Sequence, residues 1–587
     1  MRFQHLICFA LVAGLAGSVT LAQQVPPAAT PGGALPRVQS TVPPVAPPTN
    51  LFSIPRVYDR PLGLDEGPKL VVKSFRLAGA MDRPEHGVKV ADAQAILDAA
   101  KDSQPAGGYS INQLQAVAAK VATYYRDHGY ILAQAFVPEQ QVANGEVLVQ
   151  VLEGRLGSIQ VEGNKDYRAQ VLMRPFKSLV GAPVEKDDIE SALLTLTNYP
   201  GITAFGVLGS GHDVGATNLT LRVQNEDRFR LETVVDNHGS QFAGEYRGQV
   251  TFTYNDPLHM ADKLQLVGLY AMDSDSRSGH GWYGGIDYDI PLFSPHDSLR
   301  FLHLTNSYNV GAASQVVPTD SDGRTRVDEI GYRHDFAPTR LGTASLGLAF
   351  NVKSSTFNSP PSTVFDDKLT TARADFQWER VDTRFQGVNK LGLSYTHGFK
   401  DLFGSLGDYD ASATGGASRL DATGEFNKVA AQLQRLQHLT QYTSLILRVD
   451  AQYSPDPLVS LEQFSLGGSD SVRAYPVSEF LAESGGVATI ELTAGAPGFA
   501  RRPAFGGRSW GQILQFSIFA DYGTGTLNKP HLASQPSSFN LGGVGGSIQF
   551  SIPGRVFARL DVATPVTSHK ASNGRDPQFF FSLGASF

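Results

Sequence analysis

Residues 228–587 alternate between apolar and polar side chains with a period of two. In the last segment Phe579 and Leu583 lie on one face and Ser582 on the other, and only Phe580 breaks the alternation. Segments of about ten residues with one apolar and one polar face are typical of a membrane-spanning barrel. A soluble β-sandwich or propeller is the alternative, but its strands are usually shorter. We therefore predict a transmembrane β-barrel.

The pattern predicts about sixteen antiparallel strands, an even number that places both ends of the barrel on one side of the membrane. Connections should then alternate between short turns and long loops. The connection at about 495–511 is an exception, because it is long where a short turn is expected. The predicted strands begin near residues 228, 246, 263, 282, 299, 327, 344, 370, 390, 426, 443, 488, 513, 541, 555 and 579. The predicted long loops are 309–325, 354–368, 399–424 and 454–486.

The first residues have the features of a secretory signal peptide. Arg2 supplies a positive charge, residues 6–15 form an apolar core, and Ala22 provides a small residue at the cleavage site. We predict a signal peptide over residues 1–22. The single cysteine of the chain, Cys8, lies within it, so the mature protein is expected to have no disulfide and no thiolate metal site.

Composition and motifs narrow the classes of protein further. No later segment has about eighteen consecutive apolar residues, so membrane-spanning helices are excluded. The net charge of −7 gives no electrostatic argument for binding nucleic acid. The chain lacks a His-Glu-x-x-His motif, a Gly-x-Ser-x-Gly motif and a phosphate-binding glycine loop, and His296, His303 and His438 are scattered. We predict that the protein is not an enzyme and has no catalytic residue, cofactor or metal site.

Two regions precede the predicted barrel. Residues 23–68 are rich in proline, which removes backbone donors and favours extended geometry, so we interpret them as a linker or tail. A ligand for a peptide-binding module is the alternative. Helix and strand signals then occur twice in the same order, in units at 69–155 and 156–226. In the first unit Ser110 can cap a helix that Gly129 ends. Each unit is predicted to be a small α+β domain.

A glycine-rich stretch at 465–480 is predicted to be a loop between two barrel strands, and it contains Arg473. Asp521 lies on the polar face of the next strand but one. In a barrel both side chains point into the lumen, where a guanidinium and a carboxylate can pair in a bidentate manner. Alternatively, Arg473 is a solvated loop residue and Asp521 is one of many lumen charges.

Short motifs in the α+β units resemble a known family. The residues from Gly129 to Pro138, from Gly145 to Gly157, and from Val161 to Asn164 resemble the polypeptide-transport-associated (POTRA) region of the haemolysin secretion/activation family. These proteins are outer-membrane transporters of two-partner secretion and relatives of the BamA-type barrel assembly machinery. Val235 to Ser240 resembles the first barrel hairpin of the family. The resemblance covers roughly residues 69–587.

Two motifs of the family fall on the residues singled out above. The family has a Val-Arg-Gly-Tyr signature on a loop that enters the barrel, and a Phe-x-Asp-x-Gly motif on a strand. The chain departs from the first motif at Ala474, which stands where the family has glycine. If that glycine has a positive φ, an alanine at the same position would be strained. The matching loop residues are Gly467, Gly468, Val472, Arg473, Ala474 and Tyr475, and the matching strand residues are Phe519, Asp521 and Gly523.

The resemblance implies a function and its partners. Periplasmic POTRA domains would capture an unfolded exoprotein by edge-strand addition, and the loop latched by Arg473 and Asp521 would shift to let it pass through the barrel of the outer membrane. Candidate cargo-binding residues lie on the edge strand or in the helix groove of the second unit, around residues 189–208: Ile189, Leu193 and Phe205. The further partners implied are outer-membrane lipids and the barrel assembly machinery, which would read the C-terminal Phe587. No nucleic-acid partner is expected.

Two alternatives differ from secretion. One is an outer-membrane protein insertase of the same superfamily, although the main insertase usually carries more than two POTRA units. The other is a passive porin, which the tandem units argue against. Some members of the family also have an N-terminal plug helix in the barrel, but the prolines before Asp65 make such a helix unexpected here.

Overall fold

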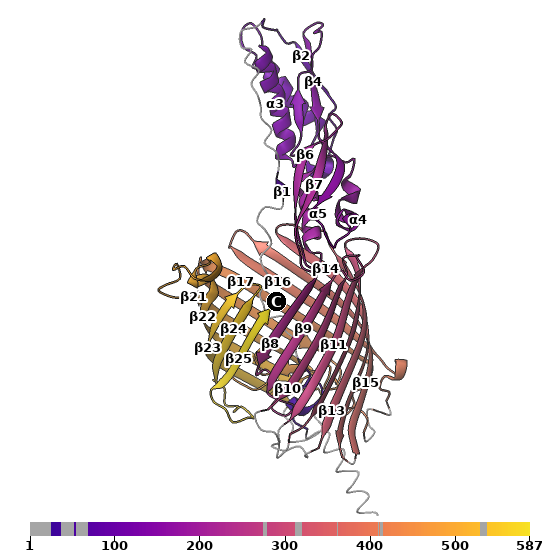
Figure 1. Cartoon of the computed structure of the whole chain (residues 1–587), viewed down its shortest axis with the longest axis vertical. Helices are drawn as coiled ribbons and strands as arrows, with labels where there is room; N and C mark the ends of the chain where they lie inside the picture. Colours follow the sequence, from indigo (N-terminus) through magenta and orange to yellow (C-terminus); the bar gives the residue numbers. More distant parts are fainter. Residues whose placement is uncertain are drawn as a thin grey trace, which may run out of the picture.

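The computed structural model describes residues 25–36, 52–53, 68–273, 279–311, 320–360, 362–408, 410, 415–528 and 537–587. The predicted signal peptide, residues 1–22, lies outside the described residues. Two α+β units form a column on one end of a barrel (Figure 1). Within the described residues, no helix is both long enough and apolar enough to cross a membrane.

The first α+β unit is a three-stranded sheet with two main helices. Strands occur in the order β2-β4-β3, with β2 parallel and β3 antiparallel to β4. Ser110 caps α3 through a capping box with Gln113, which confirms the predicted N-cap. Residues of α3 such as Val121 and Tyr125 are fully buried against the sheet. The elements are β2 (Ser74–Ala78), η2 (Pro84–His86), α2 (Val90–Asp102), α3 (Ile111–Asp127), β3 (Gln134–Phe136) and β4 (Glu146–Leu152).

The second α+β unit is a four-stranded sheet in the order β1-β6-β7-β5. Its outermost strand, β1 (Phe52–Ser53), comes from the proline-rich segment and pairs in parallel with Gly206 and Val207 of β6. Part of the segment interpreted as a simple linker is therefore an edge strand. The remaining elements are β5 (Arg155–Glu162), α4 (Ala169–Leu172), η3 (Arg174–Leu179), α5 (Lys186–Thr197), β6 (Ile202–Ser210) and β7 (Ala216–Glu226).

Sixteen antiparallel strands close into a barrel, as the alternating pattern predicts. The barrel closes where β25 pairs with β8, from Ser582 opposite Asp236 to Ser586 opposite Glu232. The strands are β8 (Phe229–Asp236), β9 (Tyr246–Asn255), β10 (Lys263–Met272), β11 (His280–Pro291), β12 (Asp297–Asn309), β13 (Asp322–Asp335), β14 (Gly342–Ser359), β15 (Ser362–Asp382), β16 (Gly387–Phe399), β17 (Phe426–Thr440), β18 (Thr443–Tyr453), β21 (Ser484–Gly495), β22 (Leu514–Thr526), β23 (Ser538–Ile552), β24 (Val556–Pro565) and β25 (Gln578–Ser586).

The side chains of the strands follow the predicted alternation. Phe579 and Leu583 of β25 are 51% and 53% exposed on the outer face, where lipid would cover them. Phe580, which breaks the pattern, faces inward and is 4% exposed. Its ring meets the ring of His238 edge-on, with centroids 5.8 Å apart. An aromatic partner inside the barrel therefore accounts for the exception.

One predicted loop is wrong. Residues 354–359 continue β14 and residues 362–368 belong to β15, with Ser359 opposite Ser362 in a long hairpin. The serines and prolines there suggest a loop, but Phe357 and Phe365 face each other across the strands and are 1% and 0% exposed. This aromatic pair extends the ladder beyond the point where composition indicates its end. The connection after β21 is long as predicted, and it contains η5 (Phe505–Gly507) and α6 (Trp510–Ile513).

Candidate functional site in the barrel lumen

The connection from β18 to β21, residues 454–483, folds into the barrel, and we call it the inward loop. It contains a small hairpin of β19 (Phe464–Leu466) and β20 (Phe480–Ala482). Gly467 and Gly468 follow β19 with φ of +96° and +103°. A Cβ on Gly467 would lie 2.4 Å from the carbonyl oxygen of Pro476. Glycine is therefore required where the chain leaves the hairpin and turns toward Arg473.

The structure brings Arg473 and Asp521 together. The guanidinium donates from Nε and Nη2 to the two carboxylate oxygens, over 2.8 and 2.9 Å. The backbone N–H of Arg473 also donates to Asp521, over 3.2 Å. Arg473 is 4% exposed and Asp521 3% exposed. A bidentate ion pair that is this buried fixes both the position and the orientation of the inward loop.

Two further carboxylates and a second arginine complete the cluster around Arg473. Nη1 of Arg473 donates to Glu491 on β21 over 2.8 Å and to Asp561 on β24 over 3.4 Å. Arg559 donates from Nε to Asp561 over 2.8 Å. Sequence reasoning missed Glu491 and Asp561 as partners. The signal that could have found them is their place on the polar face of predicted strands: Glu491 on the strand next to that of Asp521, and Asp561 two strands away on the other side.

The strand motif has a physical reason at each position. Phe519, Asp521 and Gly523 alternate along β22, so all three face the lumen. The ring of Phe519 lies beneath the guanidinium of Arg473, with 3.2 Å between Cζ and the ring centroid. A Cβ on Gly523 would come within 2.8 Å of Val472. The motif therefore supplies an aromatic floor, a counter-charge and the space that the loop needs.

The remaining loop residues pack into the wall of the barrel. Ala474 is fully buried beside Gly543. A Cβ on Gly543 would lie only 2.5 Å from the Cβ of Ala474. Ala474 is not among the residues with positive φ, so alanine is compatible with its backbone. The hydroxyl of Tyr475 donates to the carbonyl oxygen of His569 over 3.1 Å. Gly543 therefore accommodates the side chain by which the chain departs from the family motif.

The predicted cargo-binding residues take different positions in the second α+β unit. Ile189 and Leu193 are 1% and 0% exposed and belong to its hydrophobic core. Their side chains therefore do not reach a ligand in this conformation. Phe205 is half-buried on β6, next to the residue that pairs with β1. Of the three, Phe205 is the residue near a sheet edge.

Comparison with protein families decides the classification. The model of the "Haemolysin secretion/activation protein ShlB/FhaC/HecB" family matches residues 215–548, which is more than half of the chain. The chain belongs to the haemolysin secretion/activation family. A second model, the ShlB-type POTRA domain, matches residues 84–154. We refer to the protein from here on as the transporter and to the unit that this model matches as POTRA1. The second α+β unit, which we propose is also a POTRA domain, is labelled POTRA2.

Named relatives of the transporter are two-partner secretion proteins. The heme/hemopexin transporter protein HuxB of Haemophilus influenzae strain 86-028NP is 24% identical over 487 residues, which is 81% of each chain. The outer membrane transporter CdiB of Escherichia coli is 25% identical over 405 residues, covering 65% of this chain and 63% of CdiB. The transporter is therefore a two-partner secretion translocator of the outer membrane, with its POTRA domains in the periplasm.

Solved structures share its fold. CdiB from Escherichia coli aligns with a TM-score of 0.66 at 19% identity, covering 98% of this chain and 97% of CdiB. BamA from Haemophilus ducreyi lacking POTRA domains 1–3 aligns with a TM-score of 0.50 at 13% identity, covering 88% of this chain and all of the BamA chain. The named relatives support secretion over the insertase alternative, because HuxB and CdiB are transporters.

A short segment of the proline-rich region occupies the lumen of the transporter. Residues 25–36 form a turn that includes η1 (Pro27–Ala29). Tyr308 of β12 donates to the carbonyl oxygen of Ala29 over 2.6 Å, and Ser478 of the inward loop donates to that of Gly33 over 2.9 Å. The prolines indicate correctly that this segment is not an α-helix. Composition alone does not reveal that wall side chains can hold a compact turn through its carbonyl groups.

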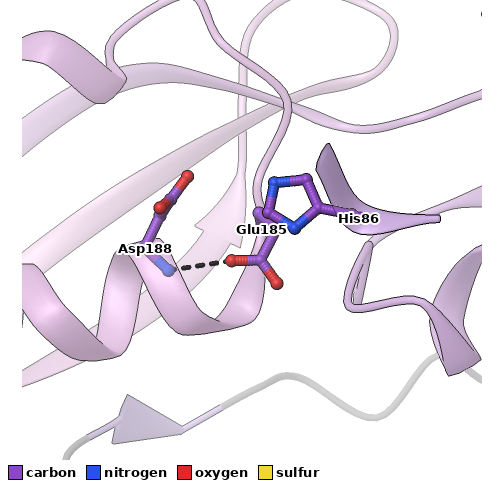
Figure 2. Close-up of side chains that lie close together, drawn as sticks. All are labelled: His86, Glu185 and Asp188. Carbon is purple, nitrogen blue, oxygen red and sulfur yellow. Dashed lines mark hydrogen bonds between the residues drawn. The ribbon is translucent and has the colours of Figure 1, made fainter. Parts of the chain in front are cut away.

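Three potential metal ligands meet where POTRA1 joins POTRA2. The ligand atoms of His86, Glu185 and Asp188 lie within 4.8 Å of one another, and Figure 2 shows the imidazole next to the carboxylate of Glu185. Glu185 already accepts a hydrogen bond from the backbone N–H of Asp188 over 2.8 Å, as the N-cap of α5. Burial raises the pKa of the Glu185 carboxyl. We therefore interpret the cluster as a helix cap that lies at the domain junction.

Gly129→Ala is expected to destabilise this junction. Gly129 has a φ of +96°, and a Cβ there would lie 2.2 Å from Oε1 of Glu185. Positive φ alone costs alanine about 1–2 kcal/mol. Gly107→Ala is a matched control, since Gly107 has a φ of +95° and open space around it. Protease digestion of the folded transporter should cut the POTRA arm faster in the Gly129 variant, and equal rates in the two variants would contradict the expectation.

Proposed function

We propose that the transporter moves an unfolded exoprotein in three steps. POTRA2 captures an extended segment, the inward loop leaves its place in the lumen, and the chain passes through the barrel. The observation that carries the proposal is the bidentate pair of Arg473 with Asp521, which holds the loop across the path of the exoprotein. Folding of the exoprotein outside the cell biases the direction, so the transporter acts without catalysis, nucleotide or cofactor.

Capture is proposed to occur along the exposed edge of β6. Among the described residues, β1 covers only the positions of Gly206 and Val207, while β6 has nine residues. Backbone donors and acceptors along the rest of that edge can pair with an extended chain of almost any sequence. The half-buried ring of Phe205 adds an apolar contact beside this edge. Ile189 and Leu193 support the site from the core and do not touch the exoprotein.

A photo-crosslinking residue at position 205 tests this capture site. It should form adducts with exoprotein that is arrested during secretion, because position 205 lies beside the open part of β6. The matched control is the same residue at Ser158, which is exposed on β5 at the opposite edge of the sheet. Equal adducts at both positions would contradict capture along β6. Phe205→Ala should lower secretion while the amount of barrel in the outer membrane stays the same.

The cargo and the assembly partners are proposed on separate grounds. HuxB is a heme/hemopexin transporter and CdiB is an outer membrane transporter, and we propose that the cargo here is a dedicated exported protein. Phe587 ends the chain next to the closing strand and is 77% exposed on the outer face. Its N–H donates to the carbonyl oxygen of Leu231 on β8 over 2.8 Å. We propose that the barrel assembly machinery reads this residue before the barrel closes, and that lipids cover it afterwards.

A further inference from the structure

The inward loop has a second charged contact, eleven residues before Arg473, that the family motifs do not include. Glu462 lies near the start of the loop and is 3% exposed. Its Oε1 is 2.6 Å from Nζ of Lys353 on β14, and its Oε2 is 2.6 Å from Nζ of Lys428 on β17. Lys428 also donates to the backbone carbonyl oxygen of Glu462, over 3.1 Å. One carboxylate of the loop thus binds two different strands of the wall.

This contact and the Arg473 cluster lie on opposite sides of the point where the loop leaves the wall. The loop leaves between β18 and β21. Lys353 and Lys428 belong to β14 and β17, which precede β18 in the barrel, whereas Asp521 and Glu491 belong to β22 and β21. The loop is therefore tied to two separate arcs of the wall, with its base on one arc and its tip on the other.

The chemistry of the two contacts differs. At the base, two ammonium groups share one carboxylate, so loss of Glu462 leaves two positive charges close together in a buried site. At the tip, the guanidinium of Arg473 is surrounded by three carboxylates, and Arg559 donates to one of them, Asp561. Removing one partner of a buried ion pair is costly in each case, because the remaining charge has no compensation.

We propose that Glu462, Lys353 and Lys428 form a second anchor of the inward loop, which holds the base independently of Arg473. Release of Arg473 alone frees the tip, and the base leaves the wall only when Glu462 separates from both lysines. The inference rests on the proposed function, in which the loop moves during secretion. The anchor itself is defined by where the loop lies, so it can be tested without an exoprotein.

Cysteine labelling separates the two anchors, since the mature chain is expected to have no cysteine of its own. Ser460 lies at the base and is 6% exposed, and Ser471 lies at the tip and is 3% exposed. Each is replaced by cysteine and treated with a membrane-impermeant maleimide on intact cells. Glu462→Gln should speed labelling at position 460 about tenfold or more, with a smaller effect at position 471. Arg473→Ala should have the opposite pattern.

Two outcomes overturn the proposal. One is unchanged labelling at position 460 in Glu462→Gln, and the other is equal acceleration at both positions in Arg473→Ala, which would indicate a single latch. The triple variant Glu462→Met, Lys353→Met, Lys428→Met guards against misfolding, because apolar replacement of a whole buried ion cluster is often neutral for stability. It should label at position 460 faster than the unsubstituted protein but more slowly than Glu462→Gln, because no buried charge is left uncompensated. Unchanged secretion in Arg473→Ala, together with faster labelling at position 460 in Glu462→Gln, would count against the proposed function and leave the anchor standing.

The reversed cluster distinguishes attraction from packing. Glu462→Lys combined with Lys353→Glu and Lys428→Glu restores opposite charges at the same positions. Slow labelling at position 460 is expected to return in this variant. Labelling as fast as in Glu462→Gln would show that packing of the native side chains, and not their charge, holds the base, and it would refute the anchor.

Discussion

Arg473→Ala is expected to reduce secretion of the exoprotein about a hundredfold or more and to raise the ion conductance of the empty barrel. The substitution removes the arginine that pairs with buried Asp521 and leaves Arg559 as the positive partner of Glu491 and Asp561. Breaking a buried pair in this way costs about 3–5 kcal/mol, and each 1.4 kcal/mol is about a factor of ten in an equilibrium. The loop would no longer be held in one place, and the exoprotein would no longer have a defined path through the lumen.

Secretion into the medium and single-channel conductance in planar bilayers measure the two effects. Arg473→Lys keeps the charge but cannot form the bidentate pair, so it should recover only part of the activity. Arg300→Ala is the matched control, because Arg300 is a wall arginine that pairs with Asp287 and Glu329. If Arg473→Ala secretes as well as Arg300→Ala, the pair with Asp521 does not hold a loop that matters for transport.

Removal of residues 25–36 is expected to increase the conductance of the barrel several-fold. Ala28 and Ala29 are 3% and 0% exposed, so the turn fills space that water and ions would otherwise occupy. Its hydrogen bond from Ser478 also connects it to the inward loop. Bilayer recordings of the deletion and the full-length transporter measure the change directly.

A milder variant is the control for this deletion. Tyr308→Phe removes only the hydroxyl that donates to Ala29 and should cost about 0.5–1.5 kcal/mol, so openings should become more frequent without a change in their maximum size. Conductance that is identical in the deletion and in the full-length transporter would show that the turn does not obstruct the pore.

Local sequence patterns predict the barrel well because its strands depend on alternation, a property that each segment carries by itself. Tyr246, Lys263, Phe426 and Thr443 begin strands in the structure as the pattern predicts. The prediction of a loop at 354–368 fails because Phe357 and Phe365 stabilise each other across two strands, whereas the composition around each of them indicates a loop.

The same distinction applies to the residues of the candidate site. The pairing of Arg473 with Asp521 can be predicted from sequence, because each residue lies within a recognisable motif and both side chains point into the barrel. Glu462 with its two lysines cannot, since these three residues come from a loop and two strands that only the closed barrel brings together. The turn at residues 25–36 is hidden for a similar reason, because its carbonyl groups rely on Tyr308 and Ser478.

If the exoprotein binds along β6 as proposed, the pairing of β1 with β6 makes its recognition a competition. The two paired residues of β1 correspond to about 1–3 kcal/mol if each backbone hydrogen bond contributes about 0.5–1.5 kcal/mol. An incoming segment that displaces β1 loses that amount, which weakens its apparent affinity about 5- to 150-fold. Only segments that pair with more of β6 than β1 does would recover the difference. The transporter would thereby discriminate against the short extended stretches of unrelated periplasmic proteins.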